Sequence, residues 1–256
     1  MTAAAFILNF TSWSVAMREY PILFTGAMVR AILEGRKRQT RRLWKMPCGL
    51  DWYVSGCMRG EETGDIHDPA TSWWGHVEEM ACPHGQAGDR LYVREAWRTT
   101  EDLDPYSGGH IGVMSQVAGY TTPWAPIQYE ADGWRSRWEH TSTPPHAADP
   151  NPGRYRHARF MPRWACRLLL EITGVRAERL QEISETDAIA EGIRPYKDGW
   201  ERFHPDPADA EHTGATKDPR LAYKGLWEQI NGAGAWDVNP WVWVVEFRPL
   251  EAGGVR

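Results

Sequence analysis

The sequence has few cysteines and no long apolar run. Four cysteines in 256 residues are too few for a disulfide framework, so we expect a reducing compartment such as the cytoplasm. No apolar segment reaches the roughly 20 residues of a transmembrane helix, so we expect no membrane partner. The formal net charge of -5 argues against a protein that coats nucleic acid through many phosphate contacts. A globular protein with a focused site remains.

What the chain does have is a concentrated basic stretch. Residues 35–42 read Gly-Arg-Lys-Arg-Gln-Thr-Arg-Arg. Apolar residues at helical spacing predict a helix over 27–34 that ends at Gly35, and a short strand is predicted over 21–24. The cations therefore follow a helix end, where we expect an anion-facing surface; the alternative is a solvated basic turn. The candidate substrate-binding side chains of this stretch are Arg36, Arg38, Arg41 and Arg42.

Lys37 lies among these arginines. Like charges disfavour an ammonium ion, so the pKa of Lys37 is expected to lie below its usual value. Such a lysine is a better base or nucleophile than a free one. Thr40, three residues later, supplies a hydroxyl group.

A further predicted strand carries a carboxylate on its apolar face. Alternation over 90–98 places Leu91, Val93, Glu95 and Trp97 on one side. A carboxylate among core-facing side chains must be paired or protonated. Glu95 is therefore either the structural partner of a cation, which we favour, or part of a substrate site.

Two longer strands are predicted in the second half of the chain. One spans 163–180 with a bend at Gly174, and Cys166 and Ile172 share one of its faces. The other spans 241–247 and has the continuous apolar character of a strand buried on both faces. We expect both strands to join those at 21–24 and 90–97 in one curved sheet or barrel.

Two helices are predicted between these strands. A capping box over 184–187 starts a short helix that closes at Glu191 and Gly192. Apolar spacing predicts the second helix over 221–230. Short strands with few helices predict an α+β fold, a small mixed β-barrel with helices plugging its ends.

Two stretches between the predicted elements read as loop-rich insertions, at about 99–160 and 194–220. They interrupt a single domain over 17–250, and residues 1–16 read as a dispensable extension and not as a signal peptide. The first insertion ends in a second basic group that could join the first across the fold. This group consists of Arg154, Arg156, His157, Arg159 and Arg163, with Arg163 a candidate substrate-binding residue.

Two residue groups leave more than one interpretation open. Cys48, Cys57, Cys82 and His84 offer four zinc ligands, but their spacing lacks a C-x-x-C pair, so we expect no metal and no cofactor. The 15 tryptophans fall partly in predicted strands, where a core role is the default. The others lie in polar stretches, where they cover loops or stack on a base.

The residues and segments above resemble the ASCH domain family, a branch of the PUA-like fold. Its signature G-x-K-x-x-x-x-R is met by Gly35, Lys37 and Arg42. The likeness extends over about half of the chain and is nearest to the longer ASCH-like proteins of phages and prophages. It implies a small barrel with a cleft for RNA, DNA or a nucleoside, in the cytoplasm of a bacterial host cell. The segments that carry it are 28–42, 82–97, 160–193 and 227–247.

One ASCH branch contains small amidohydrolases that remove the acetyl group from N4-acetylcytidine with a lysine, a threonine and a later glutamate. The matching positions are Lys37, Thr40 and Glu191, so the resemblance implies a hydrolase with these catalytic residues. Amide hydrolysis needs a nucleophile, a base, a proton donor and oxyanion stabilisation. These residues supply the first three, and Arg42 or a backbone N–H supplies the last. The alternatives are a ribonuclease with His84 or His157 as base, and a non-enzymatic RNA- or DNA-binding module.

Overall fold

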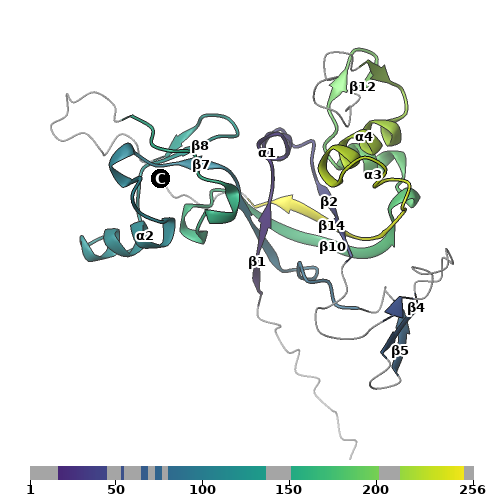
Figure 1. Cartoon of the computed structure of the whole chain (residues 1–256), viewed down its shortest axis with the longest axis horizontal. Coiled ribbons are helices and arrows are strands. Elements are labelled where there is room, and N and C mark those ends of the chain that lie inside the picture. Colours follow the sequence, from purple (N-terminus) through teal and green to yellow (C-terminus); the bar gives the residue numbers. More distant parts are fainter. Residues whose placement is uncertain are drawn as a thin grey trace, which may run out of the picture.

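A computed structural model gives the fold of the chain (Figure 1). It describes residues 17–44, 80–136, 151–201 and 214–250, with the backbone of three short strands between them. These strands, which form one sheet, are β3 (Tyr53–Val54), β4 (Asp65–Asp68) and β5 (Trp73–His76). The described part is α+β, with several sheets and few helices, as expected. The expected N-terminal extension, residues 1–16, lies outside the described residues.

A five-stranded sheet forms the centre of the molecule, in the order β1-β6-β10-β14-β2. β1 runs parallel to β6, and the other neighbours are antiparallel. Its strands are β1 (Glu19–Leu23), β2 (Gln39–Leu43), β6 (Arg90–Arg94), β10 (Leu169–Arg179) and β14 (Trp241–Pro249). Four stretches predicted to share one sheet contribute strands to it.

The predicted closed barrel is not present among the described strands. The edge strands β1 and β2 do not pair with each other there, although β10 and β14 curve strongly (Figure 1). The chain connects these two edges through α1 (Gly26–Leu33), which packs over the sheet. The sheet is therefore open and is covered by a helix.

Two predicted strands are shorter than expected. The strand over 90–98 breaks at Glu95, and Trp97–Arg98 becomes β7 of a separate three-stranded sheet. The strand expected from residue 163 starts only at Leu169, because Arg163–Ala165 forms a 3-10 turn. Cys166 is therefore not part of a strand. The other strands of the separate sheet are β8 (Ile127–Tyr129) and β9 (Arg135–Ser136).

The bend expected in β10 takes the form of a β-bulge. The register between β10 and β14 shifts between Ile172 and Gly174. An extra residue in one strand bends that strand and increases its local twist. The glycine therefore lies where the strand curves, as the sequence predicts.

The sheet buries apolar side chains on both faces. On one face, Val29 and Ile32 of α1 pack with Val245 of β14. On the other, α3 (Glu185–Ala190) and α4 (Pro219–Asn231) pack with Val242 and Val244. The prediction that the last strand is buried on both faces is confirmed.

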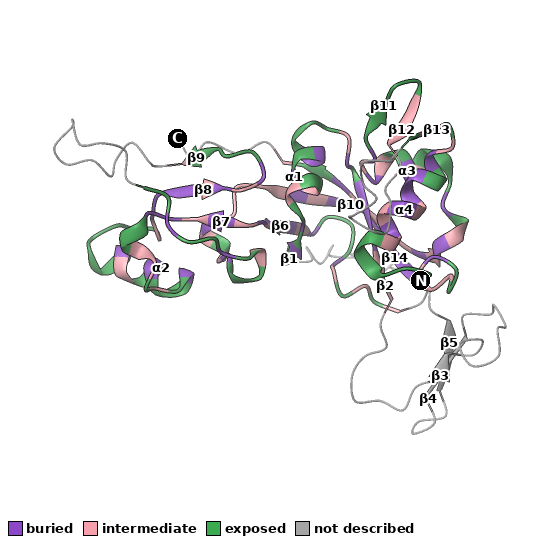
Figure 2. Cartoon of the chain, turned by 45° about the horizontal axis from the view of Figure 1, so that its top comes forward, coloured by how far each residue is buried: buried purple, intermediate pink, exposed green. Residues whose placement is uncertain are grey.

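The stretch at 99–160 is more regular than the expected loop-rich insertion. Its described part contains a 3-10 turn (Glu101–Leu103), the helix α2 (Gly108–Val117) and the strands β8 and β9. Figure 2 shows this unit at the opposite end of the molecule from α3 and α4. It has its own core, formed by Trp97, Ile127, Tyr129, Met161 and Ala165.

Residues 194–220 likewise contain short strands in their described part. Three of them pair in the order β11-β12-β13 and form a small sheet. Strands this short leave little periodicity in a sequence, so the stretch reads as loop. The strands are β11 (Pro195–Tyr196), β12 (Gly199–Glu201) and β13 (Ala215–Thr216).

Candidate functional site

The end of α1 positions Lys37. The N–H of Gly35 bonds to the Ile32 carbonyl and that of Arg36 to the Ala31 carbonyl, both at 2.9 Å, which is a Schellman motif. Gly35 has a φ of 72°, a conformation that favours glycine. The chain then turns so that the backbone of Lys37 forms an isolated bridge with the residue that ends α3.

That residue is Glu191, and its carboxylate binds two cations. Lys37 Nζ donates to Glu191 Oε2 and to the Glu191 carbonyl, both at 2.9 Å. Arg41 donates to Glu191 Oε1 at 3.1 Å and also pairs with Glu178 and Asp187. Lys37 is 1% exposed, and Arg41 and Glu191 are each 4% exposed. We call Lys37, Arg41 and Glu191 the Lys37 group.

The pKa of Lys37 lies below its usual value. Burial is the main cause, Glu191 opposes it, and Arg42 and Arg41 add smaller lowering effects. The direction agrees with the sequence analysis, but the main cause is desolvation and not crowding by arginines. A lysine of this kind suits a general base, yet its burial keeps a substrate from the ammonium in this conformation.

Thr40 lies outside the hydrogen bonds of the Lys37 group. It is 2% exposed on β2, opposite Val245 of β14. Successive side chains of a strand point to opposite faces, so Thr40 points away from the face that Arg41 uses. In the described part of the chain, no hydrogen bond joins its hydroxyl to Lys37 or Glu191.

Most other cations of the basic stretch also have protein partners. Arg36 pairs with Glu34 at 2.6 Å and donates to a backbone carbonyl. Arg42 donates to a carbonyl of β1 at 2.7 Å and lies over the Phe24 ring, and burial lowers its pKa. Only Arg38 among them is an exposed residue. The stretch folds back onto carboxylates and carbonyls, so the expected anion-facing surface is largely replaced by internal pairing.

Glu95 is a buried ion-pair partner. It is 1% exposed and accepts hydrogen bonds of 2.9 and 3.0 Å from Arg167. Arg167 also binds Asp132 and lies 4.2 Å from the centre of the Tyr129 ring. Burial raises the pKa of Glu95, and Arg167 opposes this shift. The structural role that we favoured is therefore the one the geometry shows.

Arg163 and His84 form no hydrogen bond or ion pair with the Lys37 group in the described part of the chain. Arg163 pairs with Glu19 at 2.7 Å on the surface. Burial, followed by the charge of Arg42, lowers the pKa of His84. Cys48 and Cys57 of the possible zinc set lie outside the described residues. The described residues contain no cluster of three or more side chains able to hold a metal ion.

Part of the second basic group lies at the start of α2. Its side chains border a cavity of about 420 Å³. Arg154 and His157 are exposed, and so are the rings of Tyr155 and Phe160, at 47% and 63%. We call this surface the Arg154 face, and its residues are Ser107, Gly108, Gly109, Arg154, Tyr155, Arg156, His157 and Phe160.

Arg156 anchors the Arg154 face. It is 6% exposed and donates to the carbonyls of Tyr106 at 2.7 Å and Leu103 at 2.9 Å. Its Nε has no hydrogen-bond partner within the described chain. The Arg154 guanidinium, by contrast, makes no ion pair with any described residue and is free to meet an anion.

Sequence reasoning found the cations of this face but missed its rings and its helix. Ser107, whose hydroxyl accepts the His110 N–H, is a typical N-cap residue. The adjacent Gly108 and Gly109 have low helix propensity and concealed the helix start. The N-cap serine was the signal that could have revealed it.

Comparisons with family models, curated proteins and solved structures find no match to this chain. The resemblance to the ASCH family therefore stays a prediction from sequence motifs. In the part of the chain that the structure describes, no helix is long and apolar enough to cross a membrane.

Proposed function

We propose that the protein is a nucleic-acid-binding module that holds a single strand of RNA or DNA on the Arg154 face. The observation that carries this proposal is the open cavity at the start of α2, where the exposed Arg154 guanidinium adjoins exposed aromatic side chains. The resemblance to ASCH proteins supports the same class of ligand. A single strand fits because unpaired bases offer ring faces for stacking.

The phosphate contacts come from cations and backbone groups. Arg154 is exposed, and Arg159, over the Phe160 ring at 5.6 Å, adds a second exposed guanidinium. The first N–H groups of a helix have no acceptor within the helix, and its dipole favours an anion there. Gly108 and Gly109 place such groups at the edge of the cavity.

The base contacts come from the two exposed rings. Stacking on an aromatic side chain contributes about 1 to 3 kcal/mol per base. Tyr155 is held edge-on against His157 with ring centres 5.1 Å apart, and Arg98 lies over its ring. Phe160 is 63% exposed, with Arg159 over its ring. Two rings in one cationic cavity suit a short strand, which agrees with a protein of net charge -5.

Arg154→Gln tests the phosphate contact. We expect weaker binding of a short single-stranded RNA and a salt slope reduced by about 0.7, the value for one phosphate contact on a single strand. Fluorescence anisotropy at several salt concentrations measures both the affinity and the salt slope. Arg220→Gln, which removes an exposed charge at the start of α4, is the matched control and should leave both unchanged. Equal effects of the two substitutions would contradict the proposal.

Phe160→Ala tests the stacking contact. We expect affinity to fall roughly 5- to 150-fold, which corresponds to about 1 to 3 kcal/mol, with the salt slope unchanged. Leu221→Ala, at another exposed apolar residue, is the control. Unchanged affinity in Phe160→Ala would exclude stacking on this ring.

A second candidate function is amide hydrolysis at the Lys37 group. It is supported by the 2.9 Å contact of Lys37 with Glu191 and by the lowered pKa of Lys37. Because both residues are buried, turnover requires Glu191 to separate from Lys37 and admit substrate. Thr40 would then have to supply the nucleophile from outside their hydrogen bonds.

The hydrolase is tested with the unmodified protein and N4-acylated cytosine nucleosides. Turnover that is lost in Glu191→Gln and in Thr40→Val, with circular dichroism unchanged, would support it. Absence of turnover across the panel would eliminate it, whatever the variants do.

A further inference from the structure

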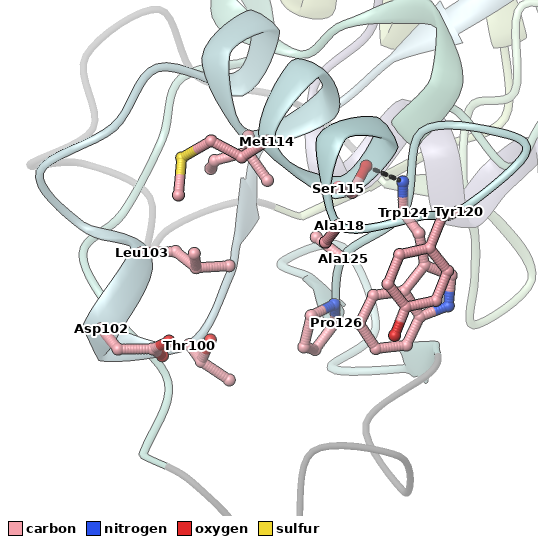
Figure 3. A pocket seen from close by; sticks show the side chains of 11 residues that line it. Thr100, Asp102, Leu103, Met114, Ser115, Ala118, Tyr120, Trp124, Ala125 and Pro126 are labelled. Atoms are coloured by element: carbon pink, nitrogen blue, oxygen red, sulfur yellow. Dashed lines mark hydrogen bonds between the residues drawn. The ribbon is translucent and has the colours of Figure 1, made fainter.

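A second and larger cavity lies beside α2. It measures about 550 Å³, which is within the range of small-molecule sites. Figure 3 shows Tyr120 and Trp124 along one wall and Leu103 and Met114 along the other. Asp102 and Thr100 lie together at one end. The cavity is thus a slot between an aromatic and an aliphatic wall.

The aromatic wall is held in place by hydrogen bonds. The Tyr120 and Trp124 rings stack at 4.9 Å with an interplanar angle of 3°. The backbone N–H of Trp124 donates to the Ser115 hydroxyl at 2.9 Å, and this hydroxyl donates to the Gly112 carbonyl at 2.8 Å. A flat, prearranged wall suits a planar ring and lowers the ordering cost of binding.

The polar groups at the slot select the ligand. Among the described residues, no lysine, arginine or histidine lines the cavity, so it favours a neutral ring over a phosphate. Asp102 is exposed, and an ionised carboxylate only accepts hydrogen bonds. A ligand that donates from an amino group matches it better than one that presents a carbonyl.

The slot lies next to the Arg154 face. Arg156, which lines that face, donates to the carbonyl of Leu103, which lines the slot. Thr100 of the slot bridges through its backbone to Pro152, two residues before Arg154. Both cavities border α2, whose ten residues span about 15 Å. A strand on the face therefore has a base within reach of the slot.

We infer that this slot binds one unpaired nucleobase carrying an exocyclic amino group, stacked on the aromatic wall with its amino group donating to Asp102. The inference rests on the proposed function and adds a base preference to it. Proteins that read an extruded base use the same combination of stacking and hydrogen bonds to its edge.

The test compares oligodeoxycytidine with oligothymidine of equal length. Both are pyrimidine strands, and at position 4 of the ring cytosine carries an amino group and thymine a carbonyl. We expect the unmodified protein to bind the cytosine strand about tenfold more tightly. Asp102→Asn should remove most of this preference, whereas Glu101→Gln, an exposed neighbour outside the slot, should keep it.

Equal affinity for the two strands, with binding still weakened by Arg154→Gln, would overturn the inference and leave the proposed function intact. If neither strand binds, the proposed function is wrong, and the binding of free nucleosides then tests the slot separately. Cytidine that quenches tryptophan fluorescence more strongly than uridine, with the difference lost in Asp102→Asn, would support the slot. No difference between cytidine and uridine would overturn it.

Discussion

At the scale of single residues, the role of each cation depends on its partners. Lys37 and Arg41 share the buried carboxylate of Glu191 and are themselves buried, although they belong to the most basic stretch of the sequence. Arg154 belongs to a less basic stretch, yet it is exposed to solvent. Charge density along a sequence therefore identified the cations but not which of them are free.

The Glu95 pair gives a residue-scale prediction about stability. Glu95→Ala leaves Arg167 without its buried partner, and loss of one partner of a buried pair costs about 3 to 5 kcal/mol. Arg163→Ala breaks the exposed pair with Glu19 and should cost less than about 1 kcal/mol. Urea denaturation measures the free energy of unfolding of both variants. If Glu95→Ala costs no more than Arg163→Ala, the buried pair does not stabilise the fold.

Cys166 gives a prediction about reactivity. Burial raises the pKa of its thiol to about 12, and only the thiolate is alkylated rapidly. At pH 8 we expect alkylation in the native protein to be on the order of 10³-fold slower than in the denatured chain. Mass spectrometry of the peptide measures the rate. A native rate close to the denatured rate would mean that the thiol is not buried.

At the scale of elements, helix caps and apolar periodicity in the sequence predict α1, α3 and α4. The ends of α1 and α3 lie where Gly35 and Gly192 predict them, and both glycines have positive φ. α2 was missed because its first turn is glycine-rich, so neither propensity nor periodicity marks it. The break after β6 could not be foreseen either. The alternation of core-facing side chains continues through Glu95 to Trp97, although the chain moves to another sheet there.

Two glycines test the helix-end argument. An added Cβ meets no atom within 4 Å at Gly35 or at Gly109, so the two positions differ in backbone conformation and not in crowding. Gly35→Ala forces a left-handed conformation and should cost about 1 to 2 kcal/mol. Gly109→Ala lies in the first turn of α2 and should be neutral or stabilising by up to about 1 kcal/mol. Thermal unfolding distinguishes the two, and equal effects would contradict the assigned helix end.

At the scale of the whole molecule, one part buries its cluster of charged side chains and another part exposes its cations to solvent. The sheet with α1, α3 and α4 holds the Lys37 group inside, among the segments that resemble ASCH proteins. The unit around α2 lies at the other end and carries the Arg154 face and the slot on its surface (Figure 2). The sequence predicted four of the five strands of the sheet, because each has an apolar row, but not β2, whose sequence Gln-Thr-Arg-Arg-Leu has none. The second unit assembles from residues distant in sequence, such as Trp97, Ile127 and Met161, which no local pattern connects.

The most direct test of the proposed function is to locate a bound strand by photo-cross-linking. A short single-stranded RNA with 5-iodouridine at its centre is irradiated with the unmodified protein, and cross-linked peptides are identified by mass spectrometry. The account predicts cross-links at 101–126 and 151–160 that disappear at high salt. Cross-links concentrated at 28–42 and 184–192 instead would place the strand at the Lys37 group and contradict the account.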